Sequence, residues 1–408
     1  MKNARNIAKS LILGNPLLRA AFSPLRAAQI ARDYRIRREH YAAIARERGL
    51  RYSEDATTAA ARARIKARGW TTTPRKVREI HTFTFVPRIE WHASLFPDLR
   101  ELGPVTEFDY AALGYKWAEF RAADRRGIAR RKEMNALVLP ALRRAHAERP
   151  VDWFFAYASG LELSADTLRR ITDELGIPTV GMCLDDMHGW TGPWMGDHHA
   201  GQKDIAAQFD LSWTSSSVAC EWYLAESARP IHLPEGFDAS LYRPLEVARD
   251  IPVSFVGAAY GFRPSVIKHL TRHGVPIQTF GAGWPNGYLA NAQKVVETFN
   301  RSRINLGMGG VMHCETLTHL KGRDFDIPGT GGGAYLTSYN ADLARYFKIG
   351  KEILCYATRD ELVEQLRHYL DRPDETQMIA RNARERCLAE HRWLHRYLNI
   401  CKVLGIIQ

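Results

Sequence analysis

The charged, glycine-rich stretch KGRDFDIPGTGGGAYLTSY, residues 321–339, carries residue types that bind phosphate. Lys321 and Arg323 supply positive charge, and Asp326 can accept two hydrogen bonds from a ribose diol. A helix N-terminus attracts anions through its free N–H groups, and glycine lets the backbone come close to a ligand. This order of residues predicts a short helix whose start faces a diphosphate, with a carboxylate that binds the ribose.

The glycines of this stretch have more than one interpretation. The string GTGGGA, residues 329–334, matches the dinucleotide fingerprint GxGxxA, but a true fingerprint opens a helix, whereas this string runs into the strand-like AYLTSY. No GxxxxGK[ST] string occurs, so a Walker A loop is excluded. Gly331 and Gly332 therefore either clear space for a bound diphosphate or permit close packing in a tight helix-to-strand turn.

A second group of polar residues follows a strand-like run in the first half of the chain. The loop LDDMHGWTGPW offers Asp185, Asp186 and His188 as candidates for acceptor binding or for base chemistry. Open parallel sheets bind ligands outside the carboxyl ends of their strands, which is where this loop is expected. Trp190 and Trp194 could stack on a sugar, although a capped strand end with a packed aromatic loop explains the same residues.

The same loop raises the question of a metal. The available ligand types are Asp186, His188, Asp197, His198 and His199. However, no DxD string is present, and the adjacent pair His198 and His199 would point to different faces of a regular element. The spacing therefore predicts no metal site.

Strand-like and helix-like runs alternate from residue 76 onward, which indicates βαβ units and parallel sheets. Strands are expected at residues 77–86, 105–110, 149–159, 177–186, 210–216, 251–261, 275–284, 303–310, 332–339 and 352–358. Helices are expected at residues 91–102, 164–176, 200–208, 263–274, 359–373 and 374–404. Because the pattern restarts after a Pro-, Gly- and Asp-rich linker at residues 233–250, two Rossmann-like halves are expected.

The charge is unevenly distributed along the 408 residues. Of the 57 Lys/Arg and 45 Asp/Glu, 17 and 5 lie in residues 1–75, which leaves 40 of each in the rest of the chain. A folded core that binds nucleic acid would carry its own basic excess, so a nucleic-acid partner is not expected. The six cysteines are scattered without a CxxC pair, which fits a reducing cytoplasm.

Residues 1–50 are basic and interrupted by prolines at Pro16 and Pro24, and their first acidic residue is Asp33. One interpretation is an amphipathic segment on an anionic membrane surface, which would place the protein peripherally at the inner membrane face. The other is a helical arm that is either solvated or packed on the body of the protein. A transmembrane span is not expected, because no apolar tract reaches about 18 residues.

Residues 177–391 resemble glycosyltransferases of the GT-B fold, and among them the spore-maturation CgeB-like branch. The resemblance is carried by KGRDFDIP with GGG, LT, F, GKEI and Y after it, by IPTVGMCLDDMH, by HLPEGFDASLYRP, and by VSFVGAAYGFR and FGAGW. It implies an α/β fold with two Rossmann-like domains facing a central cleft. The expected parts are a basic helical extension (1–75), an N-terminal acceptor domain (76–240), a nucleotide-sugar domain (241–390) and a C-terminal helix that crosses back to the first domain (391–408).

The resemblance also implies roles for individual residues. Asp326 stands where the family has a ribose-binding glutamate, and Lys321 and Arg323 would face the diphosphate. Gly257 would let the phosphates approach the first strand–helix turn, and Arg263 would bind them from the following helix.

Trp284 could flank the nucleotide base. Many retaining members of this fold have a glutamate eight positions before the ribose-binding carboxylate, but that position is Thr318 here and the nearest glutamate is Glu315. The resemblance therefore assigns no stereochemical outcome.

Taken together, these patterns favour a glycosyltransferase that moves a sugar from a nucleotide-diphosphate donor to a hydroxyl of a glycan, a lipid-linked molecule or a protein, in bacterial surface-glycan or glycoconjugate synthesis. No cofactor is expected beyond the donor itself. The alternative is a related protein that binds a sugar nucleotide or glycan without transferring it, and the missing glutamate motivates this alternative. An epimerase or phosphorylase of the same fold is a further alternative.

Overall fold

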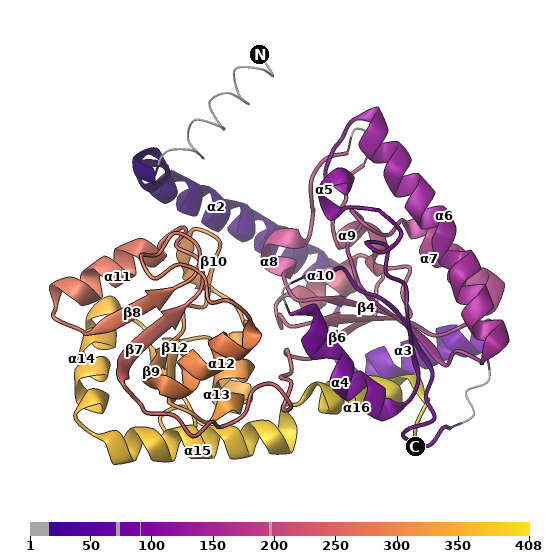
Figure 1. Ribbon diagram of the computed structural model, residues 1–408. Coiled ribbons are helices and arrows are strands. Elements are labelled where there is room, and N and C mark those ends of the chain that lie inside the picture. The colour runs from indigo at the N-terminus through magenta and orange to yellow at the C-terminus, as the bar shows by residue number, and fades with distance from the viewer. Residues whose placement is uncertain (1–15, 71–73, 90, 196–197) are drawn as a thin grey trace. The chain divides into compact units, whose positions relative to one another are not determined.

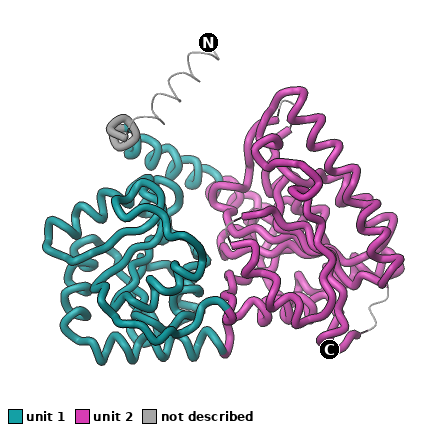
Figure 2. Tube along the Cα trace, in the orientation of Figure 1, with its two compact units in different colours: residues 1–37, 241–388 teal, residues 38–240, 389–408 magenta. Residues whose placement is uncertain are grey.

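The computed structural model describes residues 16–70, 74–89, 91–195 and 198–408, and the chain forms two compact units (Figure 2). Unit 1 combines residues up to 37 with residues 241–388, and unit 2 combines residues 38–240 with residues 389–408. Helix α2 (Pro16–Arg48) begins in unit 1 and ends in unit 2. Among the described residues, no helix is long and apolar enough to cross a membrane.

Unit 2 is built on a six-stranded parallel sheet in the order β2-β1-β3-β4-β5-β6 (Figure 1). Its strands are β1 (Thr82–Phe85), β2 (Val105–Glu107), β3 (Trp153–Tyr157), β4 (Thr179–Cys183), β5 (Leu211–Thr214) and β6 (Pro230–His232). Both β3 and β4 are almost continuously apolar, because the strands of a parallel sheet are buried on both faces.

Most helices of unit 2 connect these strands. The helices are α3 (Glu54–Ala67), α4 (His92–Leu102), α5 (Trp117–Phe120), α6 (Arg125–Glu148), α7 (Ala165–Leu175), α8 (Asp186–Gly189), α9 (Lys203–Ala206), α10 (Ala219–Ala225) and α16 (Trp393–Leu404), of which α3 precedes β1 and α16 lies at the end of the chain. The predicted helix at 164–176 is confirmed as α7: the Ser164 side chain caps its first turn, and Gly176 ends it at a left-handed φ of 69°. Helix α6 was not predicted, since a proline, Pro140, interrupts its polar sequence.

Unit 1 contains a five-stranded parallel sheet in the order β13-β12-β9-β7-β8 and a two-stranded antiparallel hairpin. The sheet strands are β7 (Ile251–Val256), β8 (Ile277–Phe280), β9 (Ser302–Leu306), β12 (Ala334–Ser338) and β13 (Leu354–Tyr356), and the hairpin strands are β10 (Gly310–Val311) and β11 (Cys314–Thr318). The helices are α11 (Arg263–Arg272), α12 (Ala292–Arg301), α13 (Arg323–Thr330), α14 (Arg359–Leu370) and α15 (Pro373–Glu390), with a 3-10 turn at Leu343–Arg345. All five sheet strands were predicted from the sequence, whereas the hairpin was not.

Residues 38–70 are part of unit 2 and not a separate extension. Ala61 and Ile65 of α3 are buried in the same hydrophobic cluster as Tyr397 of α16. Arg62 of α3 donates hydrogen bonds of 2.9 Å and 2.6 Å to the carbonyls of Val403 and Lys402, which lie at the end of α16. Residues 391–408, expected to return to the first domain, are likewise part of unit 2.

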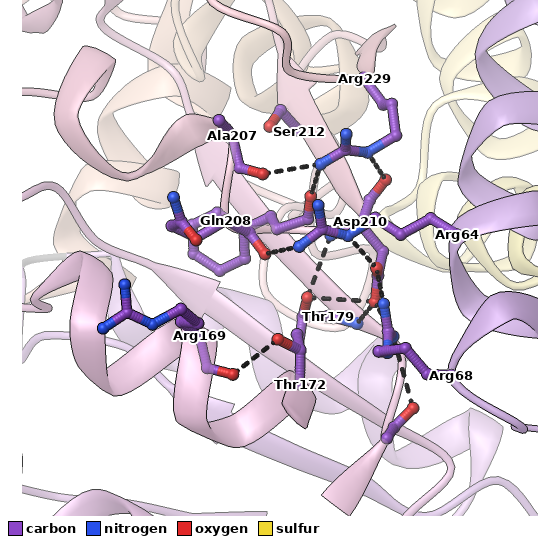
Figure 3. Close-up of polar contacts among 12 residues, drawn as sticks. Arg64, Arg68, Arg169, Thr172, Thr179, Ala207, Gln208, Asp210, Ser212 and Arg229 are labelled. Atoms are coloured by element: carbon purple, nitrogen blue, oxygen red, sulfur yellow. Dashed lines mark hydrogen bonds and ion pairs between the residues drawn. The ribbon is translucent and has the colours of Figure 1, made fainter. Parts of the chain in front are cut away.

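Two further arginines of this basic segment bind a buried carboxylate (Figure 3). Asp210 is inaccessible to solvent at the start of β5, and it accepts hydrogen bonds from Arg64 at 3.0 Å and from Arg68 at 2.6 Å and 2.7 Å. The Thr179 N–H donates to the same carboxylate at 2.9 Å. The positive charges of Arg64 and Arg68 therefore pair with a carboxylate at the sheet of unit 2.

Candidate functional site

Two arginines of unit 1 lie against the same aromatic ring. Arg263 is the first residue of α11 and Arg323 is the first residue of α13. Their guanidinium carbons lie 5.5 Å and 5.8 Å from the centroid of the Phe255 ring, near the end of β7. Arg263 is only 5% exposed; it also lies 4.3 Å above the Tyr260 ring and donates a 3.1 Å hydrogen bond to the Ala258 carbonyl.

This arginine pair has no acidic partner among the described residues. The Nε of Arg263 and the Nη1 of Arg323 are buried donors without a hydrogen-bond acceptor in that part of the chain. Burial first, and then the nearby charge of Arg323, together lower the pKa of Arg263 to about 10. Arg263 still carries its charge at neutral pH, so two cations that form no ion pair with a carboxylate, each with one unbonded buried donor, converge at one place. An anion with several acceptor oxygens would satisfy both.

Gly257 makes this convergence possible. It follows β7 with a φ of 155°, and a side chain there would meet the Phe255 ring at 3.2 Å and the Arg323 guanidinium at 3.4 Å. In the strand order of this sheet, β8 lies on one side of β7 and β9 on the other. Loops at such a switch of direction form the ligand crevice of open parallel sheets.

Trp284 supports the Gly257 turn. Its indole N–H donates a 2.6 Å hydrogen bond to the Gly257 carbonyl, and its ring meets Phe255 edge-on at 6.1 Å. The indole N–H is therefore already used inside the protein, and only the half-buried ring face remains for a nucleotide base.

The start of α13 is fixed by Asp324, a residue that the sequence analysis missed. Its carboxylate accepts hydrogen bonds from the Lys321 backbone N–H at 2.8 Å and from the Tyr335 hydroxyl at 2.5 Å. Burial raises the pKa of Asp324. Its position directly after Arg323 was the available signal, because an acidic residue in the first turn of a helix often caps it.

Lys321 and Asp326 are both partly exposed at this end of α13. The Asp326 carboxylate lies 3.6 Å from the position that a side chain on Gly322 would occupy, so it points back toward the helix start. Asp326 is thus at the same end of α13 as Arg323, as the predicted diphosphate and ribose roles require.

Gly331 and Gly332 were predicted to line the ligand, and this prediction is wrong. They follow the C-terminal end of α13, at the opposite end of the helix from Arg323. A side chain at Gly331 would meet the Arg384 side chain at 2.7 Å, and one at Gly332 would meet the Asn300 backbone at 2.5 Å. These glycines are explained by close packing in a helix-to-strand turn.

Glu315, the nearest glutamate to the expected catalytic position, is engaged elsewhere. Its two carboxylate oxygens accept hydrogen bonds from Arg359 of α14 at 3.0 Å and 2.5 Å. Arg359 also donates to the Ser265 hydroxyl at 2.8 Å. The Glu315–Arg359 ion pair connects hairpin strand β11 to α14. Thr318, at the end of the strand, has no carboxylate.

In unit 2, the three candidate residues after β4 have different environments. Asp185 and His188 are partly exposed, and the Nε2 of His188 lies 3.8 Å from the Asp185 carboxylate. Asp186 is fully buried: it accepts hydrogen bonds from the Thr214 hydroxyl and, at 2.7 Å, from the Tyr223 hydroxyl. Burial raises its pKa to about 6. Asp186 therefore cannot meet a substrate directly and instead fixes the start of α8.

The two tryptophans of this loop also differ. Trp190 is buried, and its indole N–H donates a 2.9 Å hydrogen bond to the Tyr41 hydroxyl, so it is not available to stack on a sugar. Tyr41, on the part of α2 in unit 2, donates in turn to Glu226 at 2.7 Å. Trp194 is exposed and lies edge-on to His199 at 5.0 Å.

An aromatic pair at the carboxyl edge of this sheet was missed. Strands β1 and β3 are neighbours at the point where the strand order changes direction. Tyr157 is the last residue of β3, and its ring centroid lies 5.2 Å from that of Trp91, which comes after β1 in the chain. Burial, and then the charge of Asp185, raises the pKa of Tyr157. Asp185 follows β4, the neighbour of β3, so it lies at the same edge of the sheet. Asp197, one of the metal-ligand types considered, lies outside the described residues, within which no group of three or more His, Cys, Asp or Glu is arranged for a metal.

Comparisons with known proteins agree with this architecture. Residues 263–402 match a family model described as glycosyl transferase-like. The structure is similar to sucrose-phosphate synthase from Thermosynechococcus elongatus (TM-score 0.53, 11% identity, 80% of this chain and 98% of that one). It is also similar to Anabaena HepE in complex with UDP-glucose (TM-score 0.53, 12% identity, 80% and 99%) and to a glycosyltransferase from Rickettsia africae (TM-score 0.54, 9% identity, 80% and 99%).

These similarities concern the fold. At identities of 9–12%, they confirm the expected GT-B class, a mixed α/β fold with two parallel sheets. No curated protein matches the chain in sequence.

Proposed function

We propose that the protein is a glycosyltransferase whose unit 1 binds a nucleotide-diphosphate sugar. The observation that carries this proposal is the convergence of Arg263 and Arg323, without an acidic partner in the described chain, on the glycine turn after β7. A diphosphate supplies the charge and the acceptor oxygens that both guanidiniums lack. The glycosyl transferase-like model over residues 263–402 includes both arginines and supports the same reading.

The remaining residues at this end of α13 fit the other parts of such a donor. Asp326 would accept hydrogen bonds from the two ribose hydroxyls, and Lys321 would add charge beside the diphosphate. Aspartate is one methylene shorter than glutamate, so the ribose must sit closer to the helix. Uridine is the first base to test, because HepE, which shares the fold, was crystallised with UDP-glucose.

In the reaction, the acceptor hydroxyl oxygen forms a bond to the anomeric carbon, and the bond from that carbon to the diphosphate oxygen breaks. The hydroxyl proton passes to a base, and the negative charge that develops on the leaving diphosphate is stabilised by Arg263 and Arg323. Asp185 and His188 are the proposed base and its partner, because they are the exposed titratable pair after β4.

For the acceptor we propose a hydroxyl of a glycan, a lipid-linked molecule or a protein, in the assembly of bacterial surface glycans. We also propose that the protein belongs to the CgeB-like branch, and that residues 1–50 contact an anionic membrane. Six reduced, buried cysteines support a cytoplasmic site of action.

The first test is calorimetric titration with UDP-, GDP-, ADP- and TDP-sugars. We expect one nucleotide class to bind, and to bind more weakly to Arg323→Leu and to Asp326→Ala. Absence of binding to all four would refute the proposal.

A second candidate function is binding without transfer. It is favoured by Thr318 at the usual glutamate position and by the engagement of Glu315 with Arg359. Nucleotide released from the donor in the presence of glycan acceptors separates the two functions, because a binding protein releases none. The same assay, with analysis of the sugar product, separates a transferase from an epimerase or phosphorylase.

A further inference from the structure

Three large apolar side chains are exposed around the start of α6 in unit 2. Leu113 is 53% exposed, Trp117 of α5 is 45% exposed and Ile128 of α6 is 43% exposed. Figure 1 shows α5 and the first turns of α6 at one end of unit 2, beyond the sheet. Trp117 is held rigidly, because its indole N–H donates a 2.6 Å hydrogen bond to the buried Glu162. The exposed part of Trp117 is therefore a fixed apolar surface.

Five exposed cations surround these side chains. They are Lys116, Arg121, Arg125, Arg126 and Lys132. None of the five forms an ion pair with a carboxylate in the described part of the chain. Of the three local acids, Glu119 and Glu133 pair with a sixth residue, Arg130, and Asp124 caps the start of α6 by accepting a 2.8 Å hydrogen bond from the Gly127 N–H. We call the three apolar residues and the five cations the α5–α6 patch. Residues 76–408 as a whole carry no excess of positive charge, so the patch is a local concentration.

Two of these cations occupy an unfavourable position in their helix. Arg125 and Arg126 are the first two residues of α6, directly after its N-cap residue Asp124, and the first turn itself contains no acidic residue. The positive end of the helix dipole lies there, so cations weaken the helix at this place. The stability of the helix therefore does not account for arginines at these two positions. An anionic partner outside the molecule would account for them.

We propose that the α5–α6 patch docks the protein on a membrane that contains anionic phospholipids. Lysine and arginine near such a surface are attracted to its headgroups, and tryptophan beside aliphatic side chains suits the boundary between headgroups and acyl chains. The patch fits nucleic acid less well, since the Arg121 guanidinium already lies 4.9 Å from the Trp117 ring and covers a face on which a base would stack. The proposal does not depend on transferase activity, and it adds a surface distinct from residues 1–50.

The test is flotation of the full chain with vesicles of phosphatidylcholine alone and of phosphatidylcholine mixed with phosphatidylglycerol. We expect binding to the mixed vesicles only, and weaker binding as salt is raised. Each cation near an anionic surface strengthens binding about fivefold, so Arg125→Glu/Arg126→Glu should weaken it about thirtyfold or more. Leu113→Ser should weaken it through the apolar contact. Lys348→Glu/Lys351→Glu, which reverses two exposed cations of unit 1, is the matched control and should bind like the wild type.

Weaker vesicle binding by the charge-reversal variant can be distinguished from unfolding. Glutamates at the first two positions of α6 complement the helix dipole, so the melting temperature should stay equal or rise while vesicle binding falls. Equal binding by the wild type and Arg125→Glu/Arg126→Glu would overturn the proposal and assign any flotation to another surface. Absence of wild-type binding, or a dimer in solution that the same variant abolishes without any vesicle binding, would overturn it as well.

Discussion

Replacement of Arg323 by leucine should weaken nucleotide binding without destabilising the empty protein. Burial and the Arg323 charge together lower the pKa of Arg263 to about 10 from 12.5, which corresponds to about 3 kcal/mol against its charged form. Arg323 contributes the smaller share, so Arg323→Leu should relieve a part of this cost in the unliganded protein. Leucine keeps an apolar side chain beside the Phe255 ring.

The same change removes a charge-assisted contact with the diphosphate, which is worth about 1.5–3 kcal/mol, so UDP should bind roughly 10- to 150-fold more weakly. Calorimetry with UDP measures the affinity, and thermal melting without ligand measures the stability. Arg272→Leu, at an exposed arginine at the end of α11, is the control for loss of one positive charge and should leave the affinity for UDP unchanged. An affinity for UDP within twofold of wild type, or a clear drop in melting temperature, would refute the reasoning that the two arginines are held together for an anion.

Three further predictions address other residues of the sites. Asp326→Ala should weaken UDP about tenfold or more and leave inorganic pyrophosphate within twofold, as measured by calorimetry; an equal loss for both ligands would contradict a ribose contact. Gly332→Ala should lower the unfolding free energy by about 1–3 kcal/mol in denaturant titration, because its side chain would meet the Asn300 backbone, whereas UDP affinity should not change. Asp186 has a folded-state pKa of about 6 against 3.8 unfolded, so the folded protein binds more protons between these values and Asp186 makes stability fall as pH rises from about 4 to 6. Asp186→Asn should remove that contribution from the pH dependence of thermal melting, and an identical slope in both proteins would argue against a buried, titrating Asp186.

The sequence by itself determined the class of fold. Continuous apolar runs such as WFFAY and TVGMC, with capped helices between them, require parallel strands buried on both faces, and this pattern is local. The residues at the start of α13 were also recognisable, because Lys321, Arg323 and Asp326 lie within six positions of one another. Their order alone places Arg323 and Asp326 in the first turns of one helix and Lys321 just before it.

Only the tertiary structure decided which residues from other parts of the chain contact the residues at the start of α13. Arg263 and Arg323 are sixty positions apart, and their meeting over Phe255 depends on how β7, α11 and α13 pack. Asp185 and Asp186 are adjacent in the sequence, yet one is partly exposed and the other is enclosed by the Thr214 and Tyr223 hydroxyls.

The glycines show the same limit of sequence reasoning. A glycine indicates that something approaches the backbone closely, but not whether that neighbour is a ligand or another part of the chain. At Gly257 the neighbours are the Phe255 ring and the Arg323 guanidinium at the predicted phosphate site. At Gly332 the neighbour is the Asn300 backbone. The basic N-terminal segment was evident from composition, whereas the use of Arg64 and Arg68 to bind Asp210 was not, because pairing of charges distant in sequence is decided by packing.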